Sequence, residues 1–98
     1  MSYDDFMTEN ARLVILKELA KQQDGRLNDA VLVKVLDVFG HYRSREWVAE
    51  QLDWLAQKGA VEMSRAGTAL VARITRTGAD HVERRAFIAG IDKPSFGV

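Results

Sequence analysis

The sequence predicts a single small domain of mixed α+β class, mainly α-helical with one small β-hairpin. Three observations support this prediction. A chain of 98 residues suits one domain. Up to Gly59, apolar residues recur at helical spacing in three segments, each preceded by a capping residue and followed by a glycine. After Gly59 the apolar residues alternate with other residues on either side of a central glycine, which is the pattern of a hairpin.

The first helix is predicted between Ser2 and Gly25. Asp5 follows Ser2 at the spacing of a capping box, in which the hydroxyl and the acid each accept a backbone N–H. Gly25 suits the left-handed conformation that often follows a helix. The apolar residues at helical spacing, which we expect in the core, are Phe6, Leu13, Leu16, Leu19 and Ala20.

The second helix is predicted from its cap at Asn28 to Gly40, with Leu27 and Leu32 placed to form a hydrophobic staple. The four valines in residues 31–38 make a strand the competing interpretation, because β-branched residues are poor helix formers. We favour the helix, because its apolar residues fall on one face: Leu32, Val35, Leu36 and Phe39.

The third helix, 44–58, is predicted to follow a short turn, with Ser44 as its cap and Gly59 after its end. Two amphipathic helices joined by a short turn that contains glycine form a helix-turn-helix. Trp47 and Trp54 are expected to flank the core, and the alternative is a platform that stacks on bases or on a partner. The core stripe of this helix is Val48, Leu52 and Leu55.

Two short strands are predicted around residues 66–68. Thr77 is expected to cap a last helix that extends to Gly90, with Asp80 completing a capping box. Val82 and Ala86 would continue its apolar face. The domain is therefore expected to span 1–90, and the tail 91–98 to fray or to dock irregularly. On the inner face of the hairpin we expect Val61, Met63, Leu70, Ala72 and Ile74.

Three helices, a hairpin and a last helix are the elements of a winged helix-turn-helix, in which the hairpin is the wing. The segments LDWLAQKGAVEM and LVARITRTGADHVE resemble the equivalent part of bacterial MarR-like and PadR-like regulators, which implies the same fold. The chain as a whole, from SYDDFMTENARLVIL to GADHVERRA, resembles an uncharacterised family of small proteins from Mu-like phages and prophages. The regulator motif is matched at Leu52, Leu55, Gly59, Val61, Ile74, Thr75 and Gly78.

Composition narrows the class of function. The chain has no cysteine, so it can form neither a disulfide nor a thiolate metal site, and neither His41 nor His81 has metal-ligand spacing around it. No nucleophile elbow, P-loop or dinucleotide motif is present, so we expect no enzyme, no cofactor and no small-molecule ligand. The acidic N-terminus and the absence of a long apolar run predict a cytoplasmic protein without a membrane segment.

We expect a non-enzymatic protein that binds double-stranded DNA, of the phage or prophage transcription-regulator type. Helix 44–58 would enter the major groove and the wing, 60–75, would contact the backbone. Residues 64–79 hold three arginines and no acid, which favours phosphate contact despite a net charge of zero. The candidate contacts are Arg43, Ser44, Arg45, Glu46 and Ala49 at the helix, and Arg65, Arg73 and Arg76 at the wing.

Three acids favour a rival interpretation. Glu46, Glu50 and Asp53 lie where related DNA-binding proteins face the duplex, and like charge there opposes binding. The rival is a module for protein interaction or phage assembly that uses the same scaffold without binding DNA. In either case, the first and last helices are candidates for a homodimer interface.

Overall fold

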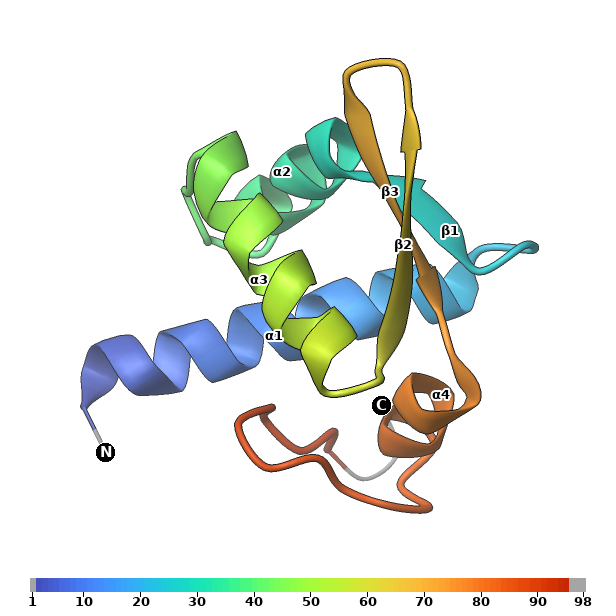
Figure 1. Cartoon of the computed structure of the whole chain (residues 1–98). Helices are drawn as coiled ribbons and strands as arrows, with labels where there is room; N and C mark the ends of the chain where they lie inside the picture. The colour runs from blue at the N-terminus through green and yellow to red at the C-terminus, as the bar shows by residue number, and fades with distance from the viewer. Residues whose placement is uncertain (1, 96–98) are drawn as a thin grey trace.

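The computed structural model describes residues 2–95, which form four helices and a three-stranded antiparallel sheet (Figure 1). This mixed α+β architecture agrees with the expected class and is compatible with a winged helix. The chain order is α1 (Tyr3–Lys21), β1 (Arg26–Asn28), α2 (Asp29–Val38), α3 (Arg45–Gln57), β2 (Val61–Ala66), β3 (Ala69–Ile74) and α4 (Arg76–Val82).

Capping side chains start the first three helices where the sequence predicted. The Asp5 N–H donates to Ser2 Oγ at 3.1 Å, and the Ser2 N–H donates to an Asp5 carboxylate oxygen, which completes the capping box. Asn28 accepts the Val31 N–H, and Ser44 accepts the Trp47 N–H. The valine-rich second segment is a helix, because the burial of Leu32 and Leu36 outweighs a small loss of helix propensity.

The sheet contains a strand that the sequence analysis missed. β1 pairs with β3 in the register Arg26↔Arg73 and Asn28↔Val71, so the strand order is β1-β3-β2. A strand of three residues is too short to show alternation, and its partner strand lies far along the chain. The Ile74 N–H also donates to the carbonyl of Gly25, which extends the pairing beyond the strand.

The hairpin of β2 and β3 is confirmed. Val61 pairs with Ile74 and Met63 with Ala72, so these four side chains share the inner face of the sheet. The turn that joins the strands passes through Gly67, whose φ of 63° favours glycine.

A single core lies between the helices and the inner face of the sheet. Its fully buried large apolar side chains come from α1, α2 and α3. They are Ile15, Leu16, Leu19, Leu32, Leu36, Val48, Leu52 and Leu55.

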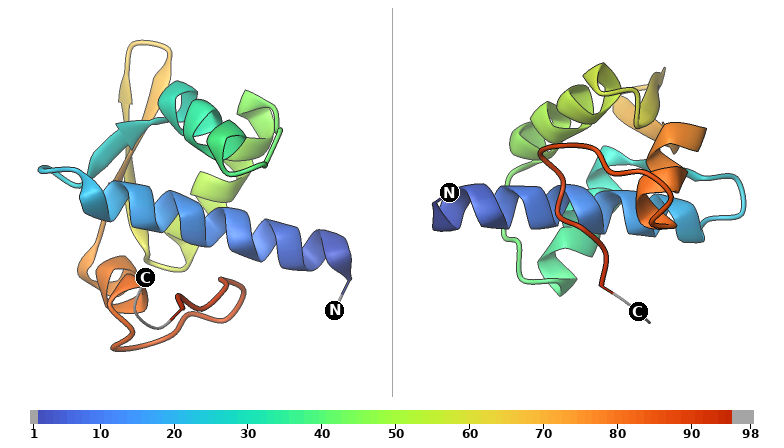
Figure 2. Two further views of the ribbon diagram at one scale, coloured as in Figure 1. Left: turned by 180° about the vertical axis from the view of Figure 1, so that it is seen from behind. Right: turned by 90° about the horizontal axis from the view of Figure 1, so that it is seen from below.

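Two aromatic residues that the sequence assigned to the core lie at the surface instead. Phe6 is 47% exposed, because the N-terminal turns of α1 extend beyond the rest of the molecule (Figures 1 and 2). Phe39 is 52% exposed and follows the last residue of α2. Ala20 is exposed as well.

The last helix is shorter than predicted and starts earlier. Thr75, not Thr77, is its cap and accepts the Gly78 N–H, while its own hydroxyl donates to the carbonyl of Gly59. The helix ends at Val82, and Arg84 has a φ of 65°, which no α-helix accommodates. The prediction that it extends through Ala86 to Gly90 was therefore wrong.

His81 explains the course of the chain after α4. The residue is completely buried. Its Nδ1 accepts the Ile88 N–H at 3.0 Å and its Nε2 lies 2.8 Å from the carbonyl oxygen of Asp92. Because Nδ1 accepts this bond, Nε2 is the nitrogen that donates to the carbonyl. These bonds hold the segment after α4 in an irregular loop against the body.

The segment that follows residue 90 joins the core rather than fraying. Ile91 is 4% exposed and belongs to the same apolar cluster as α1 and α3. The Asp92 N–H donates to the carbonyl of Glu9 on α1. Residues 96–98 of the expected tail lie outside the described residues.

Substitution of Gly78 by alanine tests the packing of α4. A β-carbon at Gly78 would overlap the carbonyl oxygen of Ala60 and lie 2.9 Å from Cγ1 of Ile74. An unstrained Gly→Ala change inside a helix stabilises by up to about 1 kcal/mol. We expect Gly78→Ala instead to lower the free energy of unfolding by about 2 kcal/mol, because overpacking forces the backbone apart. Urea denaturation followed by circular dichroism measures the sign, and a stabilised variant would contradict this packing.

Candidate nucleic-acid interface

The leading end of α3 lies beside the tip of the hairpin. The guanidinium of Arg45, the first residue of α3, is 3.4 Å from the carbonyl oxygen of Thr68 in the hairpin turn. In Figure 1 the hairpin extends away from the body on the same side as the start of α2. The structure therefore brings together the two segments on which the sequence placed DNA contacts.

Asp29 fixes this arrangement. Its carboxylate is buried and accepts two hydrogen bonds from Arg45, at 2.9 Å and 3.2 Å. It also accepts the N–H of Leu70 on β3 and its neighbour's N–H at Ala30. The hydrogen bonds from Arg45 hold the pKa of Asp29 below its usual value of 3.8, against the opposing effect of burial. One carboxylate thus joins α2, α3 and the hairpin.

Asp29 is not among the residues predicted for the site, and the sequence holds little signal that could have identified it. An acid directly after a helix cap is explained by the helix dipole alone. Its partners Arg45 and Leu70 lie on other elements, so only the fold shows the cluster. The guanidinium of Arg45 is turned toward Asp29, so this side chain joins the start of α3 to the start of α2.

The other predicted residues at α3 are mostly exposed. Arg43 lies over the ring of Trp47, with its guanidinium carbon 4.6 Å from the ring centre. Ser44 uses its hydroxyl to cap the helix, Glu46 is exposed and Ala49 is half-buried. Trp47 itself packs partly against the core, as the sequence predicted.

The predicted arginines of the hairpin and α4 do not converge. Within residues 2–95, Arg65 near the hairpin tip is exposed and has no counter-charge. Arg73, toward the other end of β3, forms an exposed ion pair with Glu62 at 2.7 Å. Arg76 at the start of α4 lies 3.8 Å from carboxylates of Asp80 and Glu83. Of these three arginines, only Arg65 thus lies toward the leading end of α3.

The outer face of α3 is acidic. Glu46, Glu50 and Asp53 are exposed along it, and none of them forms an ion pair within the described part of the chain. Asp53 accepts a hydrogen bond from the amide of Gln57 one turn on. Positive charge therefore lies at the leading end of α3, and negative charge lies along its length.

The turn before α3 is anchored through His41. His41 lies in this turn and is only 4% exposed. His41 Nε2 lies 2.9 Å from Oδ1 of Asn10 on α1, whose amide nitrogen donates to Asp92. Burial, and to a lesser degree the charge of Arg43, lower the pKa of His41 below its usual 6.5.

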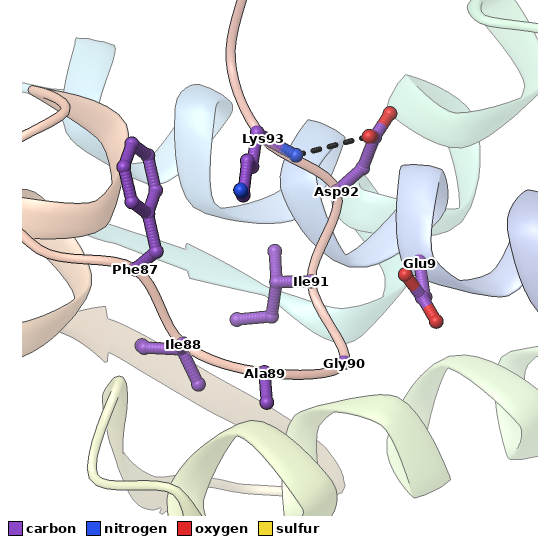
Figure 3. A pocket seen from close by; sticks show the side chains of 8 residues that line it. All are labelled: Glu9, Phe87, Ile88, Ala89, Gly90, Ile91, Asp92 and Lys93. Carbon is purple, nitrogen blue, oxygen red and sulfur yellow. Dashed lines mark hydrogen bonds between the residues drawn. The ribbon is translucent and has the colours of Figure 1, made fainter.

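The pocket beside the loop after α4 is lined by none of these candidate residues. A pocket of about 480 Å³ is lined by Glu9 and by the loop 87–93, where Ile91 and Lys93 point toward the inside of the curve (Figure 3). Residues 2–95 contain no cluster of His, Asp and Glu that could hold a metal ion. Over the same residues, no helix is both long and apolar enough to cross a membrane.

The low pKa of His41 predicts a pH-dependent stability. Above pH 6.5 the ring is neutral in both states, and below it the unfolded chain takes up the proton first. The free energy of unfolding should therefore fall as the pH decreases from about 7 to about 5. Urea denaturation at the two pH values should show a smaller fall in His41→Gln than in the wild type. An equal fall in both proteins would contradict the assignment to His41.

Loss of the Asp29 carboxylate tests its structural role. We expect Asp29→Asn to lower the free energy of unfolding by about 2 kcal/mol, because an amide cannot accept both Arg45 hydrogen bonds as well as the two from the backbone. Asp37→Asn, at an exposed aspartate of the same helix, is the matched control and should change stability little. Equal stability of the two variants would contradict this structural role of Asp29.

Comparison with known proteins supports one of the two sequence resemblances. No family model matches the chain. It is 37% identical over 91 residues to the uncharacterised protein gp26 of Escherichia phage Mu, across 93% of this chain and 94% of that protein. An uncharacterised protein of Haemophilus influenzae is 32% identical over 65 residues, across 66% of this chain and 63% of that one. The likeness to MarR-like and PadR-like regulators stays a prediction. At this identity and coverage, the chain belongs to the family of phage Mu gp26.

Proposed function

We propose that this protein is a non-enzymatic winged-helix protein that binds double-stranded DNA and regulates phage or prophage transcription. One observation carries the proposal: the tip of the hairpin is held against the leading end of α3 by Asp29, Arg45 and Thr68. The order of the elements, with a short strand between α1 and α2, is compatible with a winged helix. In such a fold, a helix that enters the major groove has the wing beside it to contact the backbone.

The charges at this end suit phosphate contact. Arg43 and Arg65 each lie within three residues of the Arg45–Thr68 contact along the chain. Neither forms an ion pair in the described part of the chain, so both are available to phosphates on either side of the groove. Arg45 would orient α3 through Asp29 rather than contact a base.

The residues left to face bases are few and partly acidic. Ser44 and Ala49 are small and allow close approach. Glu46 can accept a hydrogen bond from the amino group of cytosine. Glu50 and Asp53 lie further along α3 and would oppose the phosphates if the whole helix lay in the groove. We therefore propose that only the leading turn of α3 enters the groove.

A second candidate function is favoured by the same acids. A protein-interaction or phage-assembly module would use Glu46, Glu50 and Asp53 as an acidic surface that selects a basic partner protein. This candidate predicts no affinity for DNA, whereas the first predicts an affinity that depends on salt.

Salt-dependent binding distinguishes the two candidates. Fluorescence anisotropy with a labelled duplex of mixed sequence, over a series of salt concentrations, should show binding that weakens steeply with salt. Arg65→Ala should reduce the slope of log K against log salt by about one, because one phosphate contact is lost. Arg85→Ala removes the same charge from the segment after α4, far from the hairpin tip, and should leave the slope unchanged.

Neutralising the acids of α3 tests which part of the helix faces DNA. Glu46→Gln should change the DNA sequence preference. Glu50→Gln combined with Asp53→Asn should raise the affinity for DNA without changing that preference. Arg45→Ala is unsuitable for this test because it would disturb Asp29. Absence of binding at low salt, even at high protein concentration, would exclude the DNA proposal and favour the interaction module.

A further inference from the structure

The outer face of the sheet carries two arginines side by side. β3 runs between β1 and β2 (Figure 1), with Arg26 of β1 and Glu62 of β2 both directly opposite Arg73. Directly opposed side chains project from the same face of a sheet. Ala72, the neighbour of Arg73, is completely buried in the core. Because successive side chains alternate between the two faces, this row of three exposed charges lies on the face that looks away from the core.

The hydrogen bonds of the sheet place the two arginines at the closer kind of opposed position. One step along the register, the N–H of Ile74 donates to the carbonyl of Gly25, so these two residues form a hydrogen-bonded pair. Such pairs alternate along antiparallel strands, so Arg26 and Arg73 form a non-hydrogen-bonded pair, in which the Cα atoms are about 4.5 Å apart. Like charges at this position destabilise a sheet. A conflict of this kind with local preference is expected at a functional site.

The positive charge of this row is only partly balanced within the chain. Nη2 of Arg73 forms an ion pair with Glu62 at 2.7 Å, which leaves its other guanidinium donors available. Within residues 2–95, the guanidinium of Arg26 forms neither an ion pair nor a hydrogen bond. The nearby carboxylate of Asp24 accepts the backbone N–H of Arg26 instead. The row therefore holds two positive charges and one negative charge.

A hollow of about 300 Å³ lies over the same row. Ser64 follows Glu62 by two residues, so its side chain projects from the same face of β2. The hydroxyl of Ser64 has no hydrogen-bond partner in the described part of the chain. The hollow thus brings together two guanidinium groups and a hydroxyl, all of which can donate hydrogen bonds. Its complete lining is Arg26, Glu62, Met63, Ser64 and Arg73.

We propose that Arg26 and Arg73 bind one phosphate group in this hollow, with the hydroxyl of Ser64 as a further donor. Guanidinium groups match phosphate oxygens with paired N–H···O bonds, and a phosphate has enough oxygens to accept from two of them. A bound dianion also supplies the missing counter-charge and removes the repulsion between the arginines. The carboxylate of Glu62 opposes the anion, although its ion pair holds the guanidinium of Arg73 over the hollow.

This phosphate site does not rest on the proposed DNA binding at the hairpin tip. Arg65 is three residues from Glu62 along β2, so its side chain projects from the opposite face of the strand. The tip pair, Ala66 and Ala69, lies four positions along β2 from Glu62, which is about 13 Å. Two sources carry the same chemistry: free phosphate and the backbone phosphates of a nucleic acid.

Titration of the whole chain with inorganic phosphate tests the site directly. At constant ionic strength, the side-chain Nε–H signals of Arg26 and Arg73 should shift in NMR spectra and saturate with a dissociation constant of about 1 mM. Arg26→Gln should raise that constant at least about tenfold, because one of the two guanidinium groups is lost. Arg85→Gln removes an exposed arginine after α4 and is the matched control, which should leave the constant unchanged. Glu62→Gln should lower it, because the opposing charge is removed.

The source of the phosphate is identified by repeating the duplex titration over the salt series with Arg26→Gln. A slope of log K against log salt that falls by about one identifies a backbone phosphate, and an unchanged slope identifies free phosphate. Because inorganic phosphate is the probe for the site itself, a protein without affinity for DNA still shows the shifts of Arg26 and Arg73. Signals that do not move, equal shifts with chloride, or equal dissociation constants in Arg26→Gln and Arg85→Gln would each overturn the proposal.

Discussion

The buried carboxylate of Asp29 is the constraint on which the arrangement of the candidate surface depends. A carboxylate has about four lone-pair sites, and Asp29 uses its two oxygens to accept from Arg45, Ala30 and Leu70. A charge excluded from water is tolerated only when its hydrogen bonds are satisfied in this way. Because the donors come from α2, α3 and β3, none of these elements can shift without leaving the carboxylate under-bonded.

Most of the arginines that suggested nucleic-acid binding serve the fold or pair with neighbouring acids. Arg45 is bonded to Asp29, Arg73 to Glu62, and Arg76 lies near two carboxylates. Exposed pairs such as Arg73–Glu62 add little stability, but they cancel charge locally. Of these arginines, what remains for an external partner is the small positive region at Arg43 and Arg65, beside an acidic helix face. A surface that carries both signs of charge orients a bound partner and selects among partners more than it raises the affinity.

In the second half of α3, the side chain of Arg12 joins separate segments of the chain, as Asp29 does near the start of the helix. Its guanidinium lies 3.7 Å from the ring centre of Trp54, and it donates to Gln51 at 2.8 Å and to the carbonyl of Gly90 at 2.8 Å. The chain near Gly90 packs so closely on Trp54 that a β-carbon there would lie 2.6 Å from the ring. The loop after α4 thus completes the core between α1 and α3, where the sequence predicted more helix.

The local structure of this protein could be predicted from its sequence, because caps and apolar periodicity act between residues that are close along the chain. Ser2, Asn28 and Ser44 start their helices as expected, and Gly67 marks the hairpin turn. The absence of cysteine and the class of fold followed from composition and pattern in the same way. Trp47 and Trp54 were likewise expected to flank the core, and they do.

Only the tertiary structure decided which polar groups meet. β1 exists because β3 offers it a partner, and α4 ends early because the buried ring of His81 accepts the Ile88 N–H. Asp29 and Arg45 are adjacent only after α2 packs against α3, so only the fold shows that the guanidinium of Arg45 is bonded to Asp29. The exposure of Phe6 also depends on how far α1 extends beyond the body. Such contacts join distant residues, and their geometry is set by packing rather than by local preference.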